Sequence, residues 1–255
     1  MGLTQPRPST PIRTPDSIDG AAVRQLCRTT LERNWRAGIR RSDGAGFGYT
    51  RPSPGHYPFQ CYWDSCFSAV VWRRFDAGRA RQELESLLAA QTEDGFIGHM
   101  IYWDTPLNHR QRMTYNHVSA DALMTASIQP PALAWAWRIA VGDPAEVPAI
   151  LTHFDWFVDR RDIDGDGLIW IVQPDESGLD ASPQFDAIWE RHAHGLPGFM
   201  KLVRRNRRLG FDLRRVADAG GPVCCEVVTN VLYGLSRLAL GRPSPTGTIV
   251  ARMYD

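Results

Sequence analysis

The sequence has a single lysine, Lys201, little net charge and no long apolar run. Its 29 basic and 28 acidic residues leave a net charge of +1 at pH 7, which gives no reason to expect a nucleic-acid or membrane partner. Apolar residues make up 43% of the chain, but no run approaches the roughly 20 residues of a membrane span. Residues 1–20 lack the apolar core of a secretory signal. We therefore expect a cytoplasmic protein.

Cysteine is also scarce, and no metal-binding spacing is present. The five cysteines include no Cys-x-x-Cys pair and have no histidine pair beside them. An odd number does not suit a disulfide framework, and structural zinc needs closely spaced Cys or His ligands. We therefore expect reduced thiols, no metal and no cofactor; the cysteines are Cys27, Cys61, Cys66, Cys224 and Cys225.

What the sequence does have is helical periodicity. Apolar residues recur at the spacing of amphipathic helices in seven segments, and only residues 168–172 read as a strand. Residues 1–15 are rich in Pro, Thr and Arg, which predicts a disordered tail. The sequence therefore predicts an all-α fold whose long polar and aromatic loops lie at one end of the helices. The seven segments are residues 21–37, 63–75, 76–91, 115–140, 144–159, 183–209 and 224–240. The acids of residues 16–19 predict the start of the first helix and Asp76 that of the third, and residues 38–55, rich in Gly, Arg and Ser, are predicted to form a loop.

The most unusual stretch is PDESGLDASPQFDAIW, residues 174–189. Two prolines and a glycine prevent a continuous helix, and four acids stand close together. Asp180 lies on a tight turn that leads into a helix, where a fixed carboxylate is well placed for general acid catalysis. From the residues alone, an equally good reading is that Asp180 or Ser182 is the N-cap of that helix.

Three further stretches share this mixture of aromatic and polar residues. They are YPFQCYWDSCF at residues 57–67, DGFIGHMIYWD at 94–104 and SIQPPALAWAW at 127–137. In this order, followed by SGLDASP at residues 177–183, they resemble the motifs of the mannosylglycerate and glucosylglycerate hydrolases of glycoside hydrolase family 63. The resemblance runs from about residue 57 to about residue 240, and four motifs in register make it specific.

The resemblance implies an (α/α)6 toroid of twelve helices that hydrolyses small α-glycosides. Seven helices cannot close such a ring, and twelve at this spacing would need roughly 410 residues. We therefore expect an incomplete toroid, in which residues 16–255 form the N-terminal part of a longer catalytic domain. Apolar helix faces would then be exposed, so we also expect aggregation or self-association.

The resemblance also implies catalytic roles. Asp180 corresponds to the general acid of an inverting glycosidase, although Ala181 stands where the family usually has Asn. Such an enzyme needs a second carboxylate about 6.5–9.5 Å away to activate water. The family has a Glu late in the chain for this purpose, and no position here matches it. Glu226, in the last predicted helix, suits a structural role better, so we expect the base in a missing C-terminal part.

A sugar pocket is implied by the same motifs. Trp63 would stack on the sugar ring and Asp64 would accept sugar hydroxyls, although the residues alone also allow a core Trp and a helix N-cap Asp. Cys61 stands where the family usually has Trp, which removes a large wall of the pocket. We interpret His99 as structural. The substrate-binding residues implied by the resemblance are Tyr57, Trp63, Asp64, Tyr102, Gln129 and Gly178.

The motif DIDGDG raises a separate question. Asp162, Asp164, Asp166 and Gly167 fall at positions 1, 3, 5 and 6 of an EF-hand loop. Position 12 would be Gln173 instead of a bidentate Glu, and no second helix follows directly. We favour a turn that joins a helix to the acidic stretch. Three hypotheses remain open: an inverting glycosidase, a non-catalytic sugar-binding remnant of one, and a calcium-dependent module.

Overall fold

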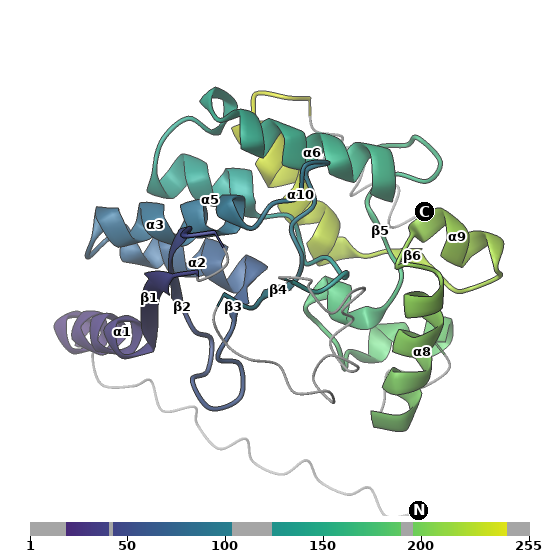
Figure 1. The fold of residues 1–255 in the computed structure, drawn as a ribbon, viewed down its shortest axis with the longest axis horizontal. Coiled ribbons are helices and arrows are strands. Elements are labelled where there is room, and N and C mark those ends of the chain that lie inside the picture. Colours follow the sequence, from purple (N-terminus) through teal and green to yellow (C-terminus); the bar gives the residue numbers. More distant parts are fainter. Residues whose placement is uncertain (1–18, 41–42, 104–123, 190–195, 244–255) are drawn as a thin grey trace, which may run out of the picture.

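The protein is described by a computed structural model at residues 19–40, 43–103, 124–189 and 196–243. Helices dominate this part of the chain, which confirms the all-α prediction. They follow an open arc from α1 at one end of the long axis to α8 and α9 at the other, as expected of an incomplete toroid (Figure 1). The tail expected at residues 1–15 lies outside the described residues. The helices are α1 (Gly20–Asn34), α2 (Tyr62–Trp72), α3 (Ala77–Ala89), α5 (Leu133–Ala140), α6 (Pro148–Arg161), α7 (Asp186–Trp189), α8 (Leu196–Arg208), α9 (Leu213–Asp218) and α10 (Val227–Ala239).

Acidic side chains begin four of these helices, with Asp212 at the start of α9 as one of them. The Asp19 carboxylate accepts a hydrogen bond from the Ala21 N–H at 2.9 Å, and Asp76 accepts one from the Arg79 N–H at 3.0 Å. At α10 the N-cap is Glu226, whose Oε2 accepts from the Thr229 N–H at 2.7 Å. Each carboxylate satisfies a backbone donor that the helix itself leaves free and lies favourably in the field of the helix N-terminus.

The number of helices differs from the prediction of about seven, because the described residues contain nine. Within the long segment predicted at residues 183–209, the described residues form the 3₁₀ helix η3 (Pro183–Phe185), α7 and α8. The segment predicted at 115–140 is helical only from Leu133, since two prolines interrupt the pattern just before it, and its first residues lie outside the described part. The short helix α9 was not predicted. Another 3₁₀ turn, η1 (Pro144–Glu146), precedes α6.

The described part of the chain has three short antiparallel strand pairs, whereas the sequence predicted a strand only at residues 168–172. They are β1 (Trp35–Ile39) with β2 (Gly46–Thr50), β3 (Gln60–Cys61) with β4 (Met100–Ile101), and β5 (Trp170–Ile171) with β6 (Cys224–Cys225).

The β1–β2 pair was predicted as a helix end and a glycine-rich loop. In the structure Gly48 belongs to β2, and a Cβ there would lie 2.6 Å from the Gln82 side chain and 2.7 Å from Trp35. Glycine therefore permits close packing at this position, and it does not mark a loop.

The core packs α2 against α3 and α5, with α10 behind α5. Trp72, near the end of α2, is buried, and its indole N–H donates to Thr50 Oγ1 at 2.8 Å. Tyr62, at the start of α2, is buried too, and its hydroxyl lies 2.8 Å from His153 Nε2 of α6. Both ends of α2 are thus held by buried polar contacts, which fixes the helix from which the site is built. No helix within the described ranges has the length and apolar character to cross a membrane.

A buried carboxyl group, Glu83 of α3, ties β2 to α2. Its oxygens accept from the Thr50 N–H at 2.9 Å, from Thr50 Oγ1 at 2.7 Å and from Ser65 Oγ at 2.7 Å. Burial raises the pKa of Glu83 to about 7, because these neutral donors offset only part of the lost hydration.

Candidate active site

A cavity of about 410 Å³ lies where the four motif stretches meet. This volume suits a small ligand. Three carboxyl groups, those of Asp64, Asp175 and Asp180, line it, and none of its described lining residues is Lys or Arg. The cavity is therefore acidic and rich in hydrogen-bonding groups. Its lining residues are Pro52, Tyr57, Cys61, Trp63, Asp64, His99, Met100, Gln129, Asp175, Gly178, Asp180 and Phe199.

The N-terminus of α2 holds three of the four stretches together. The Tyr62 N–H donates to the His99 carbonyl at 2.9 Å, and the Trp63 N–H donates to Gln129 Oε1 at 2.9 Å. These are donors that a helix start leaves free, and Cys61 at the N-cap provides no side-chain bond. Gln129 therefore uses its carbonyl oxygen to hold backbone, while its side chain also lines the cavity.

The fourth stretch is attached through Glu176. We call residues 174–180 the acid loop; it begins with the 3₁₀ helix η2 (Pro174–Ser177). Glu176 is fully buried and receives two hydrogen bonds of 2.8 Å from the Arg161 guanidinium of α6. It also accepts from the Ile128 N–H at 3.1 Å and from the Val172 N–H at 2.8 Å. One carboxylate thus fixes the acid loop beside the Gln129 segment.

Gly178 allows the acid loop to turn against α2. Its φ of 74° lies in the left-handed region, and a Cβ there would lie 2.4 Å from the Trp63 indole. Only glycine fits this combination of backbone and contact. Next to it, Ser177 Oγ donates to the Pro174 carbonyl at 2.6 Å and accepts from the Leu179 N–H at 3.0 Å. The loop that carries Asp180 is therefore rigidly built.

Asp180 lies at the cavity on the turn after Gly178. Its side chain is exposed, yet nearby protein atoms displace part of its hydration and raise the pKa of the carboxyl above its ordinary value. The N-cap alternative is wrong for Asp180 but correct in position for Ser182. The N-cap of η3 is Ser182, whose side chain makes no capping bond. A raised pKa favours the protonated form that a general acid needs.

Asp64 lies in the first turn of α2, one residue after the Trp63 indole. The N-cap of this helix is Cys61, so the alternative in which Asp64 caps it is wrong. Burial raises the pKa of the Asp64 carboxyl, while hydrogen bonds from backbone N–H and from Trp63 offset part of this effect. The indole is half-buried, with one side against Gly178, and it lines the cavity.

The two tyrosines of the predicted set have different environments. Tyr57 is exposed and lines the cavity. Tyr102 is buried in a small cluster with Phe59, Cys61 and Met100, and its ring packs edge-on to Phe59 with centroids 4.6 Å apart. Tyr102 is not among the described residues that line the cavity. The structure thus brings six of the seven predicted site residues together and places Tyr102 behind the cavity wall.

Several cavity residues were not predicted as site residues. His99 was interpreted as structural, but it lines the cavity, and its buried Nδ1 has no hydrogen-bond partner among the described residues. Burial lowers the pKa of His99 to about 4, so its imidazole is neutral at pH 7. Phe199 of α8 lies outside all four stretches, and Asp175 was only one of several acids in the loop. No sequence pattern distinguished these residues, because their role depends on where the loops fold.

Glu226 has the structural role that was favoured for it. Its Oε2 caps α10 and also accepts from Thr229 Oγ1 at 3.0 Å. It does not line the cavity. A second cavity of about 290 Å³ is lined by Arg161, the ion-pair partner of Glu176, together with Trp156, Phe211 and other residues.

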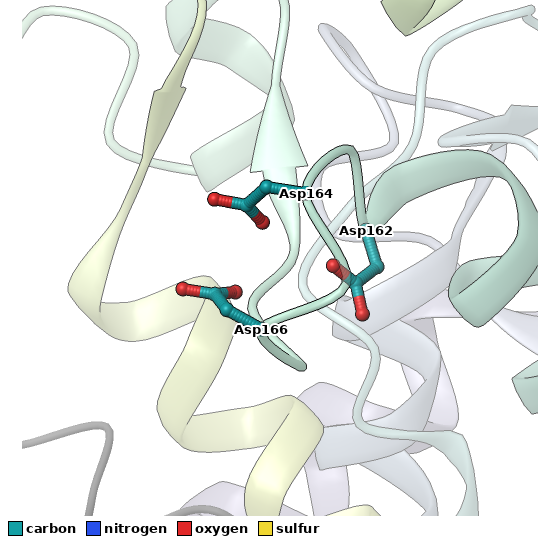
Figure 2. Close-up of side chains that lie close together, drawn as sticks. All are labelled: Asp162, Asp164 and Asp166. Carbon is teal, nitrogen blue, oxygen red and sulfur yellow. The ribbon is translucent and has the colours of Figure 1, made fainter.

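The three aspartates of DIDGDG gather on the turn between α6 and β5, which we call the Asp turn, residues 162–167 (Figure 2). Each offers an oxygen, and these oxygens lie within 4.8 Å of one another, close enough to share a divalent cation. Both Asp162 oxygens already accept backbone bonds, from Gly165 and Gly167. Gln173, at the EF-hand position 12, is buried and bonded to Asn206 at 2.9 Å. The Asp turn therefore lacks the bidentate ligand of an EF-hand.

Residues 57–239 match the family model described as "Mannosylglycerate hydrolase MGH1-like glycoside hydrolase domain". The match covers more than half of the chain, and it contains all four motif stretches and most of the cavity. The chain therefore belongs to this family of glycoside hydrolase domains.

Individual relatives agree with the family. A mannosylglycerate hydrolase of Rubrobacter radiotolerans is 33% identical over 159 residues, which cover 56% of this chain and 36% of the relative. A glucosylglycerate hydrolase of Mycolicibacterium hassiacum is 26% identical over 179 residues, 61% of this chain and 40% of the relative. The chain thus spans about a third to two fifths of the length of these relatives.

A solved structure extends the similarity to the fold. The GH63 mannosylglycerate hydrolase from Thermus thermophilus, in complex with Tris and D-glycerate, superposes with a TM-score of 0.66 and 25% sequence identity. The match covers 87% of this chain and 61% of that chain. The helical arc of Figure 1 is therefore the corresponding part of a larger helical fold.

Proposed function

We propose that this chain carries the general acid and a sugar-binding wall of an inverting glycoside hydrolase site. The substrates would be small α-glycosides such as mannosylglycerate or glucosylglycerate, which are the substrates named for the relatives. One observation carries the proposal: Asp180 shares a cavity with side chains from all four motif stretches. Fold similarity to an enzyme solved with D-glycerate supports the same substrate class.

Asp180 is the proposed general acid. In its protonated form it donates its proton to the glycosidic oxygen as the bond to the sugar breaks, which stabilises the leaving group. The raised pKa of Asp180 supports this role, because a larger share of the carboxyl is protonated near neutral pH than for an ordinary aspartate. The bonds of Glu176 and Ser177 hold the acid loop, and so fix the backbone from which this carboxyl extends.

The remaining predicted residues are proposed to hold the sugar. The Trp63 indole presents an apolar face to the ring, and Asp64 accepts hydrogen bonds from ring hydroxyls. The Gln129 amide group and Tyr57 add polar contacts, and Gly178 lets the acid loop pack directly against one side of the indole. Tyr102 is proposed as a substrate contact on the resemblance alone, since its ring lies behind the cavity wall.

The general base is proposed to come from outside the described residues. An inverting enzyme needs a carboxylate that activates water on the far side of the sugar ring. Glu226 is occupied as a helix cap and does not line the cavity.

A second candidate function is sugar binding without catalysis. The observation in its favour is Cys61, which is buried at the cavity where the family usually has Trp. Loss of that wall would weaken the hold on a substrate in the position that hydrolysis requires. Binding by the Trp63 side of the cavity would be retained.

The test is to incubate a longer protein, in which this chain is joined to the part that would supply the base, with mannosylglycerate and, separately, glucosylglycerate, and to follow the released sugar by proton NMR. An inverting enzyme releases the β-anomer first. We expect Asp180→Asn to lower the rate by about 10²–10⁴-fold, because the amide has no acidic proton to donate. Asp159→Asn is a matched control, since it removes an exposed carboxylate from α6 outside the cavity.

The outcomes separate the two candidates. Release of the β-anomer that is lost in Asp180→Asn but kept in the control supports the hydrolase. Saturable binding in a calorimeter without release of sugar supports the binding protein. Near-normal turnover by Asp180→Asn removes Asp180 as the acid, and a chain that neither binds nor cleaves either glycoside contradicts both proposals.

A further inference from the structure

A second aspartate of the acid loop, Asp175, lines the same cavity as Asp180. It lies in η2, and its residue is only 8% exposed. Its neighbour Glu176 points into the fold, where it binds Arg161 and two backbone N–H groups. Asp175 has no such cation among the described residues, although its carboxyl group is almost as deeply buried.

One oxygen of Asp175 is left without a partner. Its Oδ1 is inaccessible to water and makes no hydrogen bond to any described residue. Other polar groups of the loop do have partners: Ser177 makes two hydrogen bonds and Glu176 makes four contacts of this kind. An unpaired buried carboxyl oxygen is costly and uncommon in native proteins. Asp175 lines the cavity, so a turn of its carboxyl group about the last side-chain bond brings this oxygen to the cavity, where a ligand group can supply the missing partner.

The charges around Asp175 favour a neutral carboxyl group. Burial raises the pKa of Asp175 well above its ordinary value, and the nearby carboxylates of Glu176 and Asp180 raise it further. Arg161 pairs with Glu176, whereas no described cation pairs with Asp175. The Gln173 side chain offsets a smaller part of the effect. A protonated carboxyl group is both a donor and an acceptor, so it can donate a hydrogen bond to a sugar hydroxyl or accept one from it.

We propose that Asp175 is a sugar-binding residue, whose carboxyl group makes a hydrogen bond to a hydroxyl of the glycoside held beside Asp180. This inference rests on the proposed function, because it requires a sugar in the cavity. The sugar would then contact two carboxyl groups, that of Asp64 and that of Asp175, which lies on the same rigid loop as Asp180. Asp175 thereby positions the sugar relative to Asp180 through a loop that Glu176 and Ser177 hold in place.

A purely structural role makes the opposite prediction for stability. If Asp175 supported the fold, for example through Gln173, its replacement by Leu would lower the melting temperature. If it is kept for binding, the apolar side chain removes an unpaired polar group from the interior, and the melting temperature should stay the same or rise. Stability and affinity should therefore move in opposite directions in Asp175→Leu.

The experiment titrates the chain with mannosylglycerate by calorimetry and compares Asp175→Leu, Asp175→Asn and the control Asp159→Asn. We expect about tenfold weaker binding for Leu, since one hydrogen bond to the sugar is lost. The Asn variant should keep most of the affinity, because its amide also donates and accepts. The control should bind within about twofold of the unchanged chain, because its carboxylate lies outside the cavity.

Deoxy sugars identify the hydroxyl concerned. Methyl α-mannosides that lack the hydroxyl at C2, C3, C4 or C6 are titrated into the unchanged chain, Asp175→Leu and Asp175→Asn. One deoxy analogue should bind the unchanged chain more weakly than the parent mannoside does. For that analogue, Asp175→Leu should cause no further loss of affinity. Such a double-mutant cycle detects a direct contact between the two groups.

The results distinguish the inference from the function on which it rests. If the unchanged chain binds neither mannosylglycerate nor the methyl mannosides, the proposed function fails. If it binds them and Asp175→Leu binds equally well, with no coupling to any hydroxyl, only the role of Asp175 is overturned. If Asp175→Leu does not fold, the structural role is supported against our proposal, unless Asp175→Asn shows altered preference for a single deoxy analogue.

Discussion

The Asp turn and the acid loop are both dense in carboxylates and close together in the sequence, but they differ physically. In the Asp turn, partly exposed side chains accept hydrogen bonds from backbone N–H groups of their own turn. In the acid loop, Glu176 is buried and bound to Arg161, Asp175 is buried with an unpaired oxygen, and Asp180 lies at a cavity. The number of acidic residues in a loop therefore does not predict the chemistry of its carboxylates. What decides the chemistry of a carboxylate is whether its oxygens already have partners and how much water remains around it.

The largest effect that this comparison predicts is on stability. Glu176→Gln removes the charge opposite the buried Arg161 guanidinium, and an uncompensated buried charge costs about 3–5 kcal/mol. Asp164→Asn in the exposed Asp turn should change the free energy of unfolding by less than about 0.5 kcal/mol. Urea unfolding of both variants, followed by circular dichroism, measures the difference. Equal effects would show that burial does not separate the two regions.

A second prediction separates burial from ion pairing. Glu83 is buried like Glu176, but its hydrogen bonds come from neutral donors on Thr50 and Ser65, and its pKa rises from 4.5 to about 7. Since the folded state holds its proton more tightly than the unfolded state, the stabilising contribution is complete below pH 4.5. This contribution to the free energy of unfolding, on the order of 3 kcal/mol, is lost as the pH rises through about 7.

The measurement is the free energy of unfolding in urea at about pH 5 and at about pH 7.5, on either side of the folded-state pKa. We expect the unchanged chain to lose more stability over this interval than Glu83→Gln, which cannot titrate at this position. Asp64, Asp175 and Asp180 also have raised pKa values and contribute with the same sign in both proteins. Identical slopes for the two proteins would mean that Glu83 titrates normally.

The smallest effect concerns calcium at the Asp turn. Both Asp162 oxygens are already used by the turn, and Gln173 takes the place of the strongest EF-hand ligand. We therefore expect about 1 mM calcium to change the melting temperature by less than about 1 °C. A rise of several degrees that Asp164→Asn abolishes would instead establish a calcium-dependent module.

Much of the helical framework could be predicted from the sequence. The acid near residue 19 and Asp76 marked helix starts correctly, because capping is a local property of a few residues. The β1–β2 pair could not be predicted in the same way. Gly48 looked like a loop residue, whereas its role depends on Trp35 and Gln82, which pack against it only in the folded chain.

The candidate site shows the same division. Residues within recognisable motifs, such as Trp63 and Gln129, were predicted and do meet at the cavity. Asp175 and Phe199 were not, because their position depends on how the acid loop and α8 approach α2. Tyr102 was predicted from its motif, yet the β3–β4 pairing places its ring behind the wall with Phe59. Motifs identify which segments form a site, and tertiary packing decides which side chains enter it.

The Arg161–Glu176 pair also has a mechanical consequence. Glu176 belongs to the acid loop and accepts from the Ile128 N–H, and its partner Arg161 lines the second cavity. Two hydrogen bonds of 2.8 Å fix the Arg161 guanidinium relative to Glu176, and Glu176 in turn bonds to the Val172 and Ile128 N–H groups. We therefore expect any change that shifts Arg161 from the side of Trp156 and Phe211 to shift the acid loop, and Asp180 with it.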